Sequence, residues 1–189
     1  TGRRLDRPAR VQRRQGRIRH APVDERWCLV HATHMDARET KALAKSGAVV
    51  SICPSTEANL GDGFFPLKDY LKHKGRWAVG SDSNASVSVA EELRWLEYGQ
   101  RMKHQQRNIV ATAKQPGVGA HLLYSAAAGG WQASGVDARD DSIELDGNAP
   151  ALFGATAEDL AERFIFAGNR PLIQRVTAHG VERVNGGEH

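Results

Sequence analysis

An apolar run ends in Val79-Gly80-Ser81-Asp82-Ser83-Asn84, where an aspartate enters a loop of serine and glycine. Two earlier apolar runs also lead into polar residues, the first at His31 and the second at Ser55-Thr56-Glu57, just after Cys53. A predicted helix follows each of the three runs, and this order favours parallel strands with helical cover. Parallel strands place their carboxyl ends at one edge, where (β/α) barrels build active sites. We therefore expect an α/β fold with Asp82 and His31 at that edge.

Hydrophobic spacing gives the individual elements. The expected strands of the first part are Trp27–Ala32, Ala48–Cys53 and Trp77–Gly80, and the expected helices are Asp36–Ser46, Leu67–His73, Val89–Gln106 and His121–Ala133. Glu57–Gly63 is expected to be a turn-rich loop. After about Val136 the pattern loosens, and we expect a helical turn at Ala157–Arg163 with short strands at Ser142–Leu145, Phe164–Ala167, Ile173–Ala178 and Val181–Val184. The chain is thus expected to comprise a basic arm (1–20), an α/β part (21–135) and a small β-rich appendage (136–189).

The net charge of +4 is a property of the arm. Residues 1–20 hold eight Arg and one Asp, so the remaining 169 residues hold 18 basic and 21 acidic side chains. This balance argues against a nucleic-acid-binding body, although a basic arm could bind polyanions weakly.

The two cysteines, Cys28 and Cys53, both lie in apolar runs. Two buried thiols in an α/β chain are typical of a protein in the reducing cytoplasm, and less so of a small fold held together by disulfides. No apolar run reaches about 18 residues, so no membrane span is expected. The arginine-rich start has no apolar segment of the secretory type.

The residues at the strand ends suit metal-assisted hydrolysis. Asp82 could bind a metal or take a proton from water, or it could form an Asx turn or cap a helix. His31 could ligate zinc or polarise a substrate, or it could be a hydrogen-bonded core histidine. The loop could line a substrate pocket through Glu57 and Asn59, with Asn84 nearby, although Glu57 could equally be a hydrogen-bonding loop residue.

Four segments resemble the N-formimino-L-glutamate deiminases of the amidohydrolase superfamily of zinc hydrolases. They are Leu29-Val30-His31-Ala32-Thr33-His34, Cys53-Pro54-Ser55-Thr56-Glu57-Ala58-Asn59-Leu60-Gly61-Asp62-Gly63, Gly80-Ser81-Asp82-Ser83 and Glu91-Glu92-Leu93-Arg94-Trp95-Leu96-Glu97-Tyr98-Gly99-Gln100-Arg101. The second and fourth separate this group from guanine, cytosine and triazine deaminases.

The resemblance implies part of a (β/α)8 barrel, strands six to eight, with one catalytic Zn²⁺. By this resemblance Asp82 ligates zinc and takes a proton from the attacking water, and His31 supports the substrate and the developing charge. The implied reaction hydrolyses N-formimino-L-glutamate to N-formyl-L-glutamate and ammonia in histidine degradation.

The family's other zinc ligands, three histidines, and its catalytic glutamate lie on strands that precede this chain. A catalytic zinc needs about three protein ligands, so we expect the chain alone to be inactive. The missing half or a homodimer partner would then complete it. Two alternatives remain open: another deaminase of the guanine, cytosine or triazine type, and a non-catalytic remnant with a basic binding arm.

Overall fold

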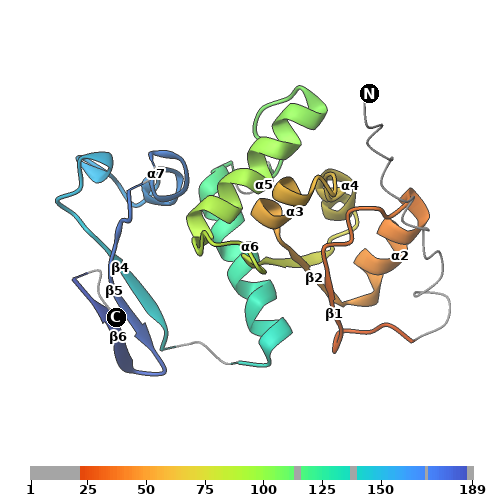
Figure 1. The fold of residues 1–189 in the computed structure, drawn as a ribbon, viewed down its shortest axis with the longest axis horizontal. Helices are drawn as coiled ribbons and strands as arrows, with labels where there is room; N and C mark the ends of the chain where they lie inside the picture. The colour runs from red at the N-terminus through yellow and green to blue at the C-terminus, as the bar shows by residue number, and fades with distance from the viewer. Residues whose placement is uncertain (1–21, 113–115, 137–139, 169, 187–189) are drawn as a thin grey trace, which may run out of the picture.

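The computed structural model describes residues 22–112, 116–136, 140–168 and 170–186. The predicted arm 1–20 lies outside the described residues. Figure 1 shows a parallel sheet near one end of the molecule, an antiparallel sheet near the other, and long helices between them. Among the described helices, none is long and apolar enough to cross a membrane.

The parallel sheet has the order β1-β2-β3, formed by β1 (Cys28–Val30), β2 (Val49–Ile52) and β3 (Arg76–Val79). Leu29 pairs with Val50, and Val50 pairs with Trp77. These strands confirm the predicted ones to within two residues at each end. The central strand is apolar on both faces because helices cover it, so Val49, Val50 and Ile52 are fully buried.

The connections between these strands are helices α2 (Ala37–Ser46), α3 (Pro54–Leu60) and α4 (Leu67–Lys72). Asp36 caps α2, because its side chain accepts the Glu39 N–H while the Glu39 carboxylate accepts the Asp36 N–H. Gly47 ends α2 at φ +84°, a conformation that glycine adopts without strain.

The loop predicted at Glu57–Gly63 is wrong in its first half, because α3 continues to Leu60. Pro54 occupies the first turn, where its missing N–H costs nothing. The Glu57 carboxylate accepts the N–H of Cys53, the residue that precedes the helix. Gly61 then ends the helix at φ +71°. The turn residues therefore mark the end of a helix instead of a long loop.

Two long helices, α5 (Val89–His104) and α6 (Val118–Ser134), follow the sheet. Helix α6, predicted from His121, begins three residues earlier. Its Gly129 lies so close to β3 that an added Cβ would overlap the backbone carbonyl of Trp77. This glycine allows close packing of α6 on the sheet.

The C-terminal part holds a second sheet, antiparallel, of β4 (Ser142–Leu145), β5 (Ile173–Ala178) and β6 (Val181–Asn185). These three strands were predicted. The strand predicted at Phe164–Ala167 is wrong, because residues up to Phe166 belong to helix α7 (Leu160–Phe166). Phe164 and Ile165 are buried in the core with α5 and α6, so their apolar side chains form the buried face of a helix. The predicted boundary between the α/β part and the appendage, at residues 135 and 136, stays a prediction.

Candidate functional site

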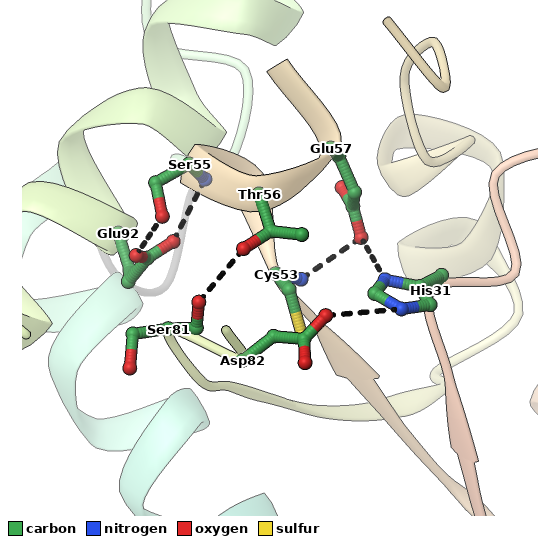
Figure 2. A network of polar contacts seen from close by, with 8 residues as sticks. All are labelled: His31, Cys53, Ser55, Thr56, Glu57, Ser81, Asp82 and Glu92. Atoms are coloured by element: carbon green, nitrogen blue, oxygen red, sulfur yellow. Dashed lines mark hydrogen bonds and ion pairs between the residues drawn. The ribbon is translucent and has the colours of Figure 1, made fainter. Parts of the chain in front are cut away.

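The site is built where the three parallel strands end (Figure 2). His31 follows β1, Cys53 follows β2, and Asp82 lies three residues after the end of β3. His31 and Asp82 have positive φ angles of 66° and 53°, which turn the chain sharply out of the sheet. Non-glycine residues in this region are strained and concentrate at functional sites.

The imidazole of His31 lies between two carboxylates. Its Nδ1 is 3.3 Å from Oε1 of Glu57, and its Nε2 is 3.5 Å from Oδ2 of Asp82. The His31 and Asp82 side chains remain 35% and 38% exposed, whereas Glu57 is buried. The ring is therefore oriented from the protein side by Glu57, and its other nitrogen faces Asp82 at the open side.

Glu57 is held inside the site by two contacts. Its Oε1 accepts the N–H of Cys53 at 2.9 Å and lies close to His31. Burial raises the pKa of the Glu57 carboxyl, although both contacts act against that rise. Glu57 also lines a cavity of about 320 Å³ together with Gly61 and Gly63.

Cys53 adds a buried thiol to the cluster. One ligand atom from each of His31, Cys53 and Asp82 lies within 4.8 Å of the other two. Burial raises the pKa of the Cys53 thiol to about 11, and the charges of Glu57, Asp82 and Glu92 act in the same direction. Cys28, by contrast, is exposed on edge strand β1, so the prediction of two buried thiols is wrong for that residue.

A second buried carboxylate, Glu92, was missed by the sequence reasoning. It lies in the first turn of α5, where the helix dipole favours acidic residues, so its position in the sequence alone indicates no second role. Its two oxygens accept the backbone N–H and the hydroxyl of Ser55. Burial raises the pKa of Glu92. The pair fixes the start of α3, and the hydroxyl of Thr56 donates to the carbonyl of Ser81 at 2.8 Å. Helix α3 is thus tied to both α5 and the loop that carries Asp82.

The remaining predicted pocket residues lie elsewhere. Asn59 is exposed near the end of α3 and is not among the residues that line the cavity beside Glu57. Asn84 stabilises its own turn, because its Oδ1 accepts the N–H of Ser86 at 2.9 Å. Neither residue joins the His31 cluster through an observed contact. Their roles as pocket residues stay predictions.

The arrangement combines donors that fit a divalent metal. Imidazole, carboxylate and thiolate are all zinc ligands, and a buried carboxylate on the far nitrogen of a histidine is the usual support for such a ligand. The same groups also suit proton transfer, since an imidazole facing a carboxylate can hold or release a proton at Nε2.

Comparison with known proteins gives the site a context. Formimidoylglutamate deiminase from Pseudomonas aeruginosa is 49% identical over 174 residues, which are 88% of this chain and 38% of that protein. The crystal structure of an amidohydrolase from Brucella melitensis matches with a TM-score of 0.83 and 41% identity, covering 90% of this chain and 39% of that one. An adenosine deaminase from Xanthomonas campestris, solved with bound zinc, shares the fold at 21% identity with a TM-score of 0.74, over 88% of this chain and 38% of that one.

The chain therefore spans about two fifths of the length of these relatives. The model of the amidohydrolase family matches residues 6–143, well over half of the chain. Together with the α/β fold and the polar residues at its strand ends, this match shows that the chain belongs to the amidohydrolase family.

Proposed function

We propose that this chain is the C-terminal part of a zinc-dependent deiminase that hydrolyses N-formimino-L-glutamate to N-formyl-L-glutamate and ammonia. The observation that carries the proposal is the placement of His31 between Glu57 and Asp82 at the ends of three parallel strands. The 49% identity to formimidoylglutamate deiminase supports this substrate.

The parallel sheet would supply strands six to eight of a (β/α)8 barrel. Barrels close their sheets, whereas here β1 and β3 each have only one hydrogen-bonded neighbour among the described strands. The rest of the barrel would pair with these edges and contribute the other metal ligands and substrate contacts, either from a separate chain or from a preceding segment.

Each site residue has a role in the proposal. Asp82 would hold the zinc ion and accept a proton. His31 would bind the substrate through Nε2 and support charge that develops there, and Glu57 would orient its ring. A bound zinc ion supplies a Lewis acid and lowers the pKa of bound water to about 7. The exposed side of His31 and Asp82 leaves room for the substrate.

The proposal also covers the cell compartment of the protein and the activity of the isolated chain. The buried free thiol of Cys53 suits a reducing cytoplasm. The 189-residue chain alone is expected to release no ammonia from the substrate, because groups that would complete the barrel are outside it.

A chimera tests the substrate. Residues 22–186 replace the matched segment of the P. aeruginosa deiminase, and ammonia release is measured with N-formimino-L-glutamate and, in parallel, with guanine. Turnover of the formimino compound alone supports the proposal. Turnover of guanine alone would contradict the proposal and favour guanine deamination, since a probable guanine deaminase from Deinococcus radiodurans is 31% identical over 117 residues.

A further inference from the structure

We propose that Thr56 is a positioning residue, whose hydroxyl keeps the carboxylate of Asp82 directed into the site. Thr56 is 3% exposed and lies in the first turn of α3. Its hydroxyl donates to the carbonyl of Ser81 at 2.8 Å, a contact between residues 25 apart in the chain (Figure 2). Ser81 directly precedes Asp82, so the hydroxyl acts on the backbone that carries the carboxylate.

The backbone at Asp82 is a tight turn. The carbonyl of Ser81 also accepts the N–H of Asn84 at 3.1 Å, which makes Asp82 the first central residue of the turn. Asp82 has a φ of 53°, and Ser83 is not among the described residues with positive φ. A positive φ at the first central position alone is the pattern of a type II′ turn, where glycine is the preferred residue. Asp82 therefore occupies a position that strains its backbone.

The contact with Thr56 opposes relaxation of this strained turn. Strained residues persist only where the surrounding structure holds them in place. The peptide between Ser81 and Asp82 is planar, so fixing its carbonyl also fixes the direction of its N–H. The φ angle of Asp82 is the rotation about the next bond of the chain. The Asn84 contact is local and moves with the turn, whereas the Thr56 hydroxyl ties the turn to helix α3.

The next residue of α3 contacts the other half of the site. Oε1 of Glu57 lies 3.3 Å from Nδ1 of His31, a residue that also has positive φ. Two consecutive residues of one helical turn thus contact the two segments whose side chains face each other, with Nε2 of His31 and Oδ2 of Asp82 3.5 Å apart. Loss of the Thr56 hydroxyl would release Asp82 and leave the support of His31 intact.

Two isosteric variants of the chimera separate positioning from stability. Thr56→Val removes the hydroxyl that reaches Ser81. Thr40→Val is the matched control, because Thr40 is 1% exposed and its hydroxyl donates to the carbonyl of Asp36 at 2.7 Å, in α2. Each variant removes one hydroxyl–carbonyl bond of a buried threonine, and ammonia release is measured well below the Tm of both.

The expected kinetic result is a split between kcat and KM. Displacement of a reacting group by about 1 Å costs roughly 100-fold, so Thr56→Val should lower kcat by about 10–100-fold and change KM by less than about threefold. Thr40→Val should keep the wild-type kcat. Equal kcat values for Thr56→Val and Thr40→Val would overturn the proposal. Thr56→Ala takes the place of Thr56→Val should the added methyl group prevent folding.

The conservative variant Thr56→Ser tests the hydroxyl itself. It keeps the donor and removes only a methyl group, so its kcat should stay within about threefold of wild type. A loss in Thr56→Ser as large as that in Thr56→Val would overturn the proposal, because the methyl group and not the hydrogen bond would then matter.

Crystal structures of the Thr56→Val and Thr56→Ser chimeras give a readout that needs no turnover. In Thr56→Val we expect the φ of Asp82 to leave the positive region, and in Thr56→Ser to stay near 53°. An unmoved Asp82 in Thr56→Val would overturn the proposal. The inference rests on the proposed function for its kinetic readout alone: a wild-type chimera that releases no ammonia would remove the deiminase, and the two crystal structures would then decide the role of Thr56.

Discussion

Replacement of Glu92 should separate the hydrogen-bonding role of this buried carboxylate from its charge. Glu92→Ala leaves the N–H and hydroxyl of Ser55 without their acceptor in a buried position. Each bond to a charged acceptor contributes about 1.5–3 kcal/mol. Because the cost of burying the carboxylate offsets part of this gain, we take the lower end for the two bonds and expect a loss of about 3 kcal/mol in the free energy of unfolding. At roughly 2–4 °C per kcal/mol for a chain of this size, Tm should fall by about 6–12 °C.

Glu92→Gln should behave differently. Its amide oxygen can accept the Ser55 N–H, and its amide nitrogen can donate to the Ser55 hydroxyl, so both groups stay paired. Stability should remain within about 1 kcal/mol of wild type, because the cost of burying a charge also disappears. Urea unfolding followed by circular dichroism measures both variants. Glu91→Ala serves as the control, because it removes a first-turn charge worth about 0.3–1 kcal/mol together with the hydrogen bond that the Ser86 hydroxyl donates to Glu91. Equal destabilisation by Gln and Ala, or an unchanged Glu92→Ala variant, would refute the reasoning.

Three further predictions concern pH, thiol reactivity and packing. Because burial raises the pKa of Glu92 above its ordinary 4.5, the stabilising contribution of this group is complete below that pH and is lost as pH rises through the higher folded value. Wild-type stability relative to Glu92→Gln should therefore decrease between pH 4 and 8 in urea titrations, and a flat or rising difference would contradict this. At pH 7.5 a disulfide reagent should rapidly label one thiol, that of the exposed Cys28. Cys53 should react slowly, because it is buried and burial raises the pKa of its thiol to about 11. Rapid labelling of the remaining thiol in the Cys28→Ser variant would contradict this. Gly129→Ala should lower the free energy of unfolding by about 1–3 kcal/mol, because its new Cβ overlaps a backbone carbonyl of β3. The neighbouring variant Gly130→Ala has open space around the new Cβ and should raise the free energy of unfolding by roughly 0.5–1 kcal/mol. Equal Tm shifts of the two variants would argue against close packing of α6 on β3.

The strands and most helices could be predicted because their signals are local. Asp36 and Gly47 cap one helix within a dozen residues, and three apolar runs end in polar residues. The error at α3 arose because Gly61 and Gly63 indicated a loop, whereas Pro54 and Glu57 favour a helix start. The error at Phe164–Ala167 has a tertiary cause, since a short apolar run serves a strand or a buried helix face equally well.

The candidate site, like the fold, could be predicted only where its signals are local. His31 and Asp82 could be proposed from their positions after apolar runs, because parallel strands share one edge. The contact between Ser55 and Glu92 spans 37 residues, and no local spacing predicts it. The exposure of Cys28 also depends on sheet order, since only the pairing pattern shows that β1 has one neighbour among the described strands.

The central claim is that Asp82 belongs to the catalytic end of a deiminase. Ammonia release from N-formimino-L-glutamate by the chimera carrying Asp82→Asn tests it most directly, with Asp69→Asn, an exposed aspartate on α4, as the matched control. The account predicts that Asp82→Asn abolishes measurable turnover while the folded chimera keeps its circular dichroism spectrum, and that Asp69→Asn keeps wild-type turnover. Undiminished ammonia release by the Asp82→Asn chimera would contradict the account.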